Sequence, residues 1–281
     1  MSKSRPQLLA TQVSLFLAVQ LLGLWVGWTL LKTVPVPKME TGPSILWFLI
    51  AFVIVTGSIL LALKYFKFKA PFGALFAFLI FVGSHIVFST FLPNMIAILL
   101  AVGVVSLRFL WPNIMMQNIA ILIAIAGVSA QLGVLLTVPA VIILLVALSV
   151  YDVWAVFKTK HMITMAKGLM HRGMAPMIVI PSSWRDFGKK MKEVTEEKLK
   201  PSRTPTLKYM MLGTGDLAFP LVFAVAALSY SLLSAYAVVM GALAGIIVIH
   251  FLMLSGKFKA LPALPPIAAG SIIAFAISLL L

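Results

Sequence analysis

Two aspartates are the only acidic side chains that lie deep within apolar stretches of this 281-residue chain. Asp152 stands in the segment VYDVW, and Asp216 closes the segment GTGD. The other five carboxylates lie in polar stretches: Glu40, Asp186, Glu193, Glu196 and Glu197. A carboxylate at the centre of a membrane helix costs roughly 2.5–3.5 kcal/mol on insertion scales, so an aspartate kept there indicates a function.

The chemistry open to these aspartates depends on what could neutralise them. No Lys or Arg lies in the middle of an apolar run, because Arg108 and Lys208 lie near run ends. We therefore expect each aspartate to have the other as its partner, and two neighbouring carboxyl groups in a low-dielectric site share one proton. Such a pair can hydrolyse an amide, since one carboxylate takes a proton from water while the protonated partner polarises the carbonyl. We expect no cofactor and no metal site.

The elements that hold the aspartates are membrane helices. The chain is 62% hydrophobic and 10% charged, which excludes a soluble domain. Strand alternation is absent, so we predict an all-α membrane protein, a polytopic bundle of nine transmembrane helices. The nine apolar runs cover residues 8–31, 44–63, 71–92, 94–110, 117–136, 138–157, 207–229, 231–254 and 261–281. The boundaries at 93–94 and 132–138 are the least distinct.

The orientation follows from the basic residues. If the N-terminus is cytoplasmic, only Lys32 and Lys38 of the 22 Lys and Arg residues fall outside. This asymmetry obeys the positive-inside rule, and contact with anionic lipids accounts for the net charge of +15. We expect no nucleic-acid partner, because no basic module interleaved with aromatics is present. The run from Leu8 to Leu31 is too long for a signal peptide, and no cleavage pattern follows it, so we predict a retained first span.

The organisation along the chain has four parts. Residues 1–136 hold helices one to five, 137–157 the sixth helix with Asp152, 158–206 a cytoplasmic loop, and 207–281 helices seven to nine. Inside the loop, the apolar run 176–181 is bracketed by prolines and predicts an extended segment or strand. The charged run 189–200 is expected to be solvated, and helical or disordered.

The spacing to the nearest lysines places the two aspartates at similar depths in the membrane. Asp152 lies six residues before Lys158, and Asp216 lies eight residues after Lys208. At 1.5 Å per residue, these spacings place them about 9 Å and about 12 Å from the same membrane face. The two carboxyl groups can therefore face one another across neighbouring helices.

Glycines and prolines accompany the pair at this depth. Gly213 and Gly215 remove side chains beside Asp216, which lets another backbone approach, although small residues also serve ordinary helix packing. The segment LPALPP, residues 261–266, has three prolines, which free carbonyls and remove donors. In lipid, this suits a segment that lines a cavity, and the alternative is a rigid helix entry.

These motifs resemble those of a known family. YD at 151–152, GTGD at 213–216 and PAL at 262–264 match the YD, GxGD and PAL motifs of the presenilin and signal peptide peptidase group of intramembrane aspartyl proteases. They occur in the expected order, on the sixth, seventh and ninth of nine spans. The similarity covers the C-terminal half well, whereas the first five spans match in number and hydrophobicity only. Thr214 departs from the leucine usual in presenilins, and GxGD alone also occurs in prepilin peptidases.

The resemblance implies roles for individual residues. Asp152 and Asp216 would be the catalytic pair, with Tyr151, Gly213 and Gly215 as support. The substrate would be a transmembrane helix that unwinds near the cut, and segment 208–212 would offer it a strand edge. The residues implied to contact substrate are Leu261, Pro262, Ala263, Leu264 and Leu212.

Orientation separates the branches of this group. Signal peptide peptidases are inverted, whereas the basic loop here lies inside, so we favour the presenilin orientation. The compact chain resembles a prokaryotic, archaeal homologue in the cell membrane. We expect it to act on single-span substrates among membrane lipids without accessory subunits, and a homo-oligomer is compatible with the sequence.

Other readings of the same residues remain open. The aspartates could bind ions in a proton-coupled transporter or a cation leak channel, or the chain could be an inverted, signal-peptide-peptidase-like protease or a structural scaffold. Buried polar residues elsewhere are expected to form interhelical hydrogen bonds. These residues are His85, His250, Gln12, Gln20, Gln117 and Asn118.

Overall fold

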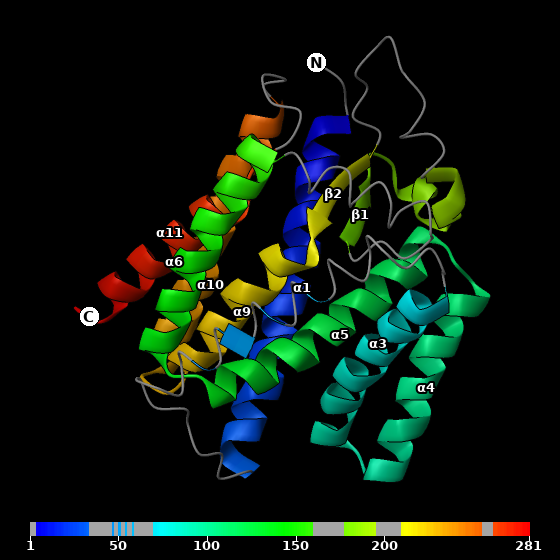
Figure 1. Cartoon of the computed structure of the whole chain (residues 1–281), viewed down its shortest axis with the longest axis horizontal. Coiled ribbons are helices and arrows are strands. Elements are labelled where there is room, and N and C mark those ends of the chain that lie inside the picture. The colour runs from blue at the N-terminus through cyan, green and yellow to red at the C-terminus, as the bar shows by residue number, and fades with distance from the viewer. Residues whose placement is uncertain are drawn as a thin grey trace.

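The computed structural model describes residues 4–33, 70–159, 177–194, 209–254 and 261–281, with five single positions between 47 and 58. This part of the chain contains eight α-helices and a two-stranded sheet (Figure 1). The helices are α1 (Ser4–Thr33), α3 (Ala70–Phe91), α4 (Asn94–Leu110), α5 (Ile114–Leu135), α6 (Val138–Trp154), α9 (Thr214–Ala227), α10 (Leu232–Leu254) and α11 (Leu264–Ser278). The shorter elements are η1 (Ala155–Thr159), β1 (Met177–Pro181), η2 (Trp184–Gly188) and β2 (Tyr209–Gly213).

The helical bundle predicted from the sequence is confirmed. Of the helices that the structure describes, five are long and apolar enough to cross a membrane, namely Pro6–Thr33, Gly73–Phe91, Ile114–Leu135, Val138–Phe157 and Leu232–Leu254. The chain is therefore an integral, multi-pass membrane protein in its architecture. The predicted second span, 44–63, lies outside the described residues apart from the five single positions. The count of nine spans and the cytoplasmic N-terminus stay predictions.

Helices α9 and α11 are shorter than the sequence predicted. Run 207–229 was expected to be helical throughout, but residues 209–213 form β2, and residues 261–263 precede α11 without regular structure. A short apolar run does not distinguish a strand from a helix by periodicity, which explains the error. At 1.5 Å per residue, α9 and α11 extend about 21 Å and about 22 Å, less than the roughly 30 Å apolar layer. Both helices can therefore begin inside that layer.

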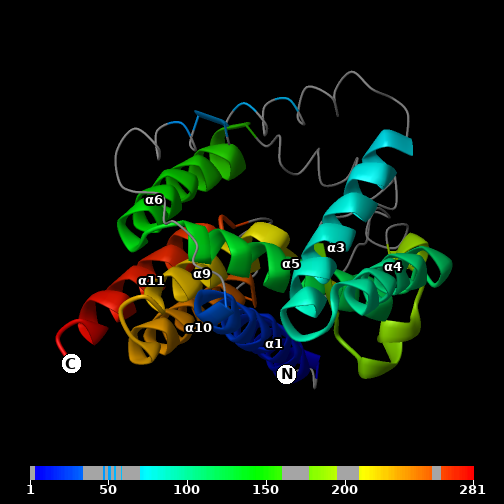
Figure 2. The ribbon, with the colours of Figure 1, turned by 90° about the horizontal axis from the view of Figure 1, so that it is seen from below.

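Helix α9 lies at the centre of the bundle. It contacts α1, α5, α6, α10 and α11, and Figure 2 shows it among these helices. Every residue from Pro220 to Ala227 is buried. Two glycines of α1 allow the close approach: a Cβ on Gly23 would collide with Leu221, and one on Gly27 would lie 2.6 Å from Val225. Close packing on all sides holds α9 in one position.

Small residues also set the other helix pairs. A Cβ on Gly127 of α5 would collide with the carbonyl oxygen of Gly83 on α3, so these two backbones touch. Gly241 of α10 and Gly270 of α11 meet in the same way. Membrane helices associate through such contacts, because lipid tails are as apolar as leucine and burial alone does not bring helices together.

The strands β1 and β2 form a two-stranded sheet at the end of the bundle where α1 begins (Figure 1). They are antiparallel, with Met177 opposite Gly213 and Pro181 opposite Tyr209. The extended segment predicted at 176–181 is confirmed as β1. Within the charged run predicted at 189–200, residues 191–194 form one helical turn, and the remainder lies outside the described residues.

Side chains of the loop anchor this sheet to the bundle. Val179, Met191, Val194 and Tyr209 form a small apolar cluster with Ile114 at the start of α5. Lys189 donates to the Tyr209 hydroxyl at 3.3 Å, and the Asp186 carboxylate at 2.8 Å raises the pKa of Lys189. The position of β2 is thereby fixed at its first residue.

Several polar side chains pair between helices, as predicted. His250 of α10 is hydrogen-bonded to Gln12 of α1 at 2.7 Å, and His85 of α3 to Asn94 of α4 at 2.9 Å. Asn118 of α5 instead bonds the sheet. Its Nδ2 donates to the Val179 carbonyl at 2.7 Å, and its Oδ1 accepts from the Val179 N–H at 3.0 Å. The amide thus occupies the place of a third strand on β1.

The glycine contacts predict the effect of an added side chain. Gly127→Leu should lower the free energy of unfolding by about 1–3 kcal/mol, because the side chain must part α3 from α5. Gly103→Leu is the matched control, since no atom of the described residues lies within 4 Å of a Cβ there. Thermal unfolding in detergent micelles, followed by circular dichroism, measures both. Equal stability of the two variants would contradict the packing described.

Candidate active site

Asp152 lies near the end of α6, and its carboxylate caps a different helix, α11. The Leu264 N–H donates to Asp152 Oδ2 at 3.2 Å, and the backbone of Ala263 donates to the same carboxylate. The side chain is almost fully buried, with 9% of its surface exposed. One carboxylate thus accepts two backbone hydrogen bonds at the start of α11.

The sequence of the PAL segment explains this arrangement. A helix leaves its first four N–H groups without partners inside the helix. In α11 these belong to residues 263–266, and two of them, Pro265 and Pro266, have no N–H. Only Ala263 and Leu264 still need an acceptor, and Asp152 supplies it. Because the prolines also suit a first helical turn, the segment both starts α11 and holds the aspartate.

Asp216 occupies the first turn of α9, three residues after the N-cap Gly213. The Gly213 backbone is hydrogen-bonded to the Asp216 carboxyl group. A Cβ on Gly213 would lie 3.1 Å from Asp216 Oδ2 and 3.7 Å from its Cγ, so glycine leaves the room that the carboxyl group occupies. Gly215 leaves room for the Phe219 ring and not for Asp216, because a Cβ at Gly215 would lie 3.3 Å from that ring.

The fold brings the two aspartates together. Asp152 is close enough to Asp216 for their charges to interact. Each also lies at a helix N-terminus: Asp216 in the first turn of its own helix, and Asp152 at the start of α11. Helix N-termini carry a partial positive charge and free N–H donors, which favour carboxylates. This accounts for two acidic groups in an apolar bundle where no lysine or arginine was expected at mid-span.

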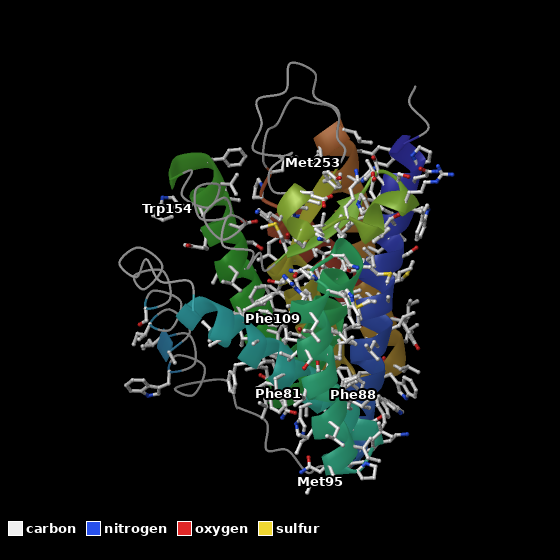
Figure 3. The ribbon with its side chains drawn as sticks, turned by 90° about the vertical axis from the view of Figure 1, so that its right-hand side faces the viewer. Phe81, Phe88, Met95, Phe109, Trp154 and Met253 are labelled. Atoms are coloured by element: carbon white, nitrogen blue, oxygen red, sulfur yellow. The ribbon has the colours of Figure 1, made fainter. Side chains whose placement is uncertain are left out.

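The remaining predicted site residues are spread over three elements. Leu264 and Leu212 are both buried at 5% exposure, whereas the residues 261–263 are partly exposed. Tyr151 is about half exposed, and its ring centroid lies 6.4 Å from that of Trp154. Figure 3 shows Trp154 on the outer side of α6. Tyr151 is therefore placed toward the surface of α6, unlike the neighbouring Asp152.

Among the described residues, β1 is the only strand paired with β2, and the opposite edge of β2 lies on the side of Asp216. Because Asn118 takes both backbone groups of Val179, those groups point away from β2. Alternation in an antiparallel pair then turns the backbone groups of Met211, which lies opposite Val179, away from β1. Gly213 lies two residues after Met211, so its backbone groups point to the same side of β2, and its backbone is hydrogen-bonded to Asp216. The backbone N–H and C=O groups of Met211 therefore point away from β1, whereas those of Leu212 point toward Ile178 on β1.

A cavity of about 220 Å³ lies between α3, α5 and the start of α9. Its walls are apolar and include Phe76, Ile80, Ile121 and Ile125, with Thr214 and Ala218 from α9. Thr214 and Ala218 are one turn apart on one face of α9, and Asp216 between them points to the other face. The sequence did not indicate this cavity, because its lining residues differ in no way from ordinary lipid-facing ones.

Comparisons with known proteins point in one direction. The profile of a family described as signal-peptide peptidase, presenilin aspartyl protease matches residues 13–281. Among solved structures, a presenilin family intramembrane aspartate protease in space group C222 is similar, with a TM-score of 0.68 and 20% identity over 97% of this chain and 98% of that one. A structure of such a protease in space group P2 gives 0.64 and 23% over 95% and 96%. A search of the curated proteins found no match.

The capping of α11 by Asp152 has a measurable consequence. Asp152→Ala should be less stable than Asp152→Asn by about 0.5–2 kcal/mol, because asparagine still accepts N–H bonds at a helix start and alanine does not. Both variants remove the charge, so their difference isolates the cap. Unfolding in detergent micelles measures it, and identical stabilities would show that Asp152 does not hold α11.

Proposed function

The chain belongs to the signal-peptide peptidase and presenilin aspartyl protease family, and on that premise we propose that it hydrolyses peptide bonds within the transmembrane helices of other membrane proteins. The observation that carries the proposal is that Asp152 and Asp216, each at a helix N-terminus within an apolar bundle, lie close enough for their charges to interact. The two residues would be the catalytic pair.

The chemistry that we propose needs only the two carboxyl groups and a water molecule. The ionised carboxyl group takes a proton from water as the water oxygen attacks the scissile carbonyl carbon, and the protonated one gives its proton to the carbonyl oxygen. The tetrahedral gem-diol then collapses: the carboxyl group that took the proton from water gives it to the leaving nitrogen as the C–N bond breaks. The other carboxylate takes the proton of one gem-diol hydroxyl, so that the pair again holds one shared proton. Backbone N–H groups of Ala263, Leu264 and Gly213 hold both carboxyl groups in place meanwhile.

A strand edge beside the pair supports an extended substrate. A peptide bond inside a helix is shielded by the helix, so a transmembrane substrate must unwind locally before water reaches it. The outward backbone groups of Met211 can pair with the unwound segment, which would then run past Asp216. Asn118 already pairs with the outer edge of β1, so the substrate would pair with the outer edge of β2. The segment from Leu261 to Leu264 would contact the same substrate.

The setting that we propose follows from the distribution of charge. The sheet lies at the end of the bundle where α1 begins (Figure 1). Arg185, Lys189, Lys190 and Lys192 lie in the segment between the strands, which supports a cytoplasmic position for this end and the presenilin orientation. We place the protein in a prokaryotic cell membrane, acting without accessory subunits on single-span substrates. No observation favours a transporter or a channel.

The proposal is tested with pure protein in lipid vesicles and a single-span substrate whose products are read by mass spectrometry. The wild type should release two peptides cut within the membrane segment. Asp152→Asn and Asp216→Asn should each lower the rate by roughly a thousandfold or more, because neither acid–base partner works alone. The proposed protease activity would be refuted if products persisted in either variant. It would also be refuted if a panel of substrates gave no products while ions crossed the vesicle membrane in an aspartate-dependent way.

The strand edge is tested by removing one N–H group. Met211→Pro deletes an outward donor without touching the bonds to β1, and proline is tolerated at such an edge position. Because one hydrogen bond contributes about 1 kcal/mol, kcat/KM should fall about fivefold relative to Met211→Ala, which loses the same side chain but keeps the donor. Equal kcat/KM values for the two variants would mean that the substrate does not pair with β2.

A further inference from the structure

A glutamine of α1 reaches the helix that carries Asp216. Gln20 is fully buried, and its Nε2 donates to the carbonyl oxygen of Leu217 at 3.0 Å. Leu217 directly follows Asp216 and is itself fully buried. The two partners are 197 residues apart in the sequence. The hydrogen bond therefore depends on the tertiary packing of α1 against α9.

The helix has a weak point at this place. Pro220 lies inside α9 and has no N–H, so the carbonyl group of Asp216, four residues earlier, lacks its helical partner. Gly213, at the N-cap, is already extended, with φ −64° and ψ 147°. The turn that carries Asp216 is thus bounded by a strand on one side and an interrupted hydrogen-bond ladder on the other. An external hydrogen bond to the next carbonyl has more effect here than in a continuous helix.

Backbone packing fixes where the amide lies. Gln20, Gly23 and Gly27 are on one face of α1 at helical spacing. They meet Leu217, Leu221 and Val225, which have the matching spacing on α9. Because a Cβ on Gly23 would collide with Leu221, the two helices touch one turn from the amide. Gln20 is therefore held at one height relative to Asp216.

We propose that Gln20 is a positioning residue for Asp216. Its amide holds the Leu217 peptide group and through it the orientation of the aspartate toward Asp152. This inference rests on the proposed function, since orientation matters to the rate only if the aspartates catalyse. The competing view is that Gln20 only joins two helices, as Gln12 does through His250 on α10.

Gln12 supplies the matched control on the same helix. Gln12 is also buried and hydrogen-bonded, but its partner is not on α9. Gln20→Met keeps the length of the side chain and removes the donor. It should lower kcat about tenfold to a hundredfold, with KM within about twofold, because small misplacements of catalytic groups carry large rate penalties. Gln12→Met should lower thermal stability by a similar amount while kcat stays near the wild-type value.

A second readout does not need activity. Hydrogen–deuterium exchange of peptides covering residues 209–219 should quicken in Gln20→Met and not in Gln12→Met. If Gln20→Met does not fold, Gln20→Asn replaces it, because the amide is one methylene too short to reach Leu217. Wild-type kcat and exchange in the Gln20 variant, or equal losses in both glutamine variants, would overturn the proposal. A wild-type protein without protease activity would instead refute the proposed function, and the exchange measurement would still decide the role of Gln20.

Discussion

A helix that begins inside an apolar layer must find acceptors for its first N–H groups, and α11 finds them in Asp152. In this contact the Leu264 nitrogen lies 3.2 Å from Asp152 Oδ2. The hydrogen bond joins α6 to α11 and offsets the cost of burying the aspartate. In water the same N–H groups would be solvated at little cost, but in lipid each unpaired group costs several kcal/mol. The carboxylate and the helix start therefore stabilise each other.

The rest of the bundle makes this contact possible. Helix α9 is buried from Pro220 to Ala227 and begins with Asp216 in its first turn, directly after β2. Asn118 and the cluster around Ile114 hold the sheet, and glycines of α1 bring that helix against α9. The two aspartates thus come near enough for their charges to interact, because each lies at the start of one of two short helices, α9 and α11. Irregular backbone at this depth is tolerable where it lines a protein interior.

Much of this arrangement could be read from the sequence, because a carboxylate in an apolar run is rare and the run lengths fix the helices. Asp152, Asp216 and the proline segment were singled out as candidates in this way. The strand β1 was predicted because its apolar run is too short for a helix and is bracketed by prolines. The strand β2 was mistaken for helix, since its five residues are as apolar as the helix that follows. Gln20 and Asn118 were recognised as interhelical polar residues, but their partners, Leu217 and Val179, depend on tertiary packing that no local pattern encodes.

We propose that Asp152 and Asp216 act as one unit with a shared proton. The most direct test is the pH dependence of kcat for the wild-type protein in vesicles. At low pH both carboxyl groups are protonated and no base remains, whereas at high pH both are ionised and no acid remains. A proton-sharing pair should therefore give a bell-shaped profile. A profile with a single limb would show that only one carboxyl group titrates in the reaction, and would contradict a proton-sharing pair.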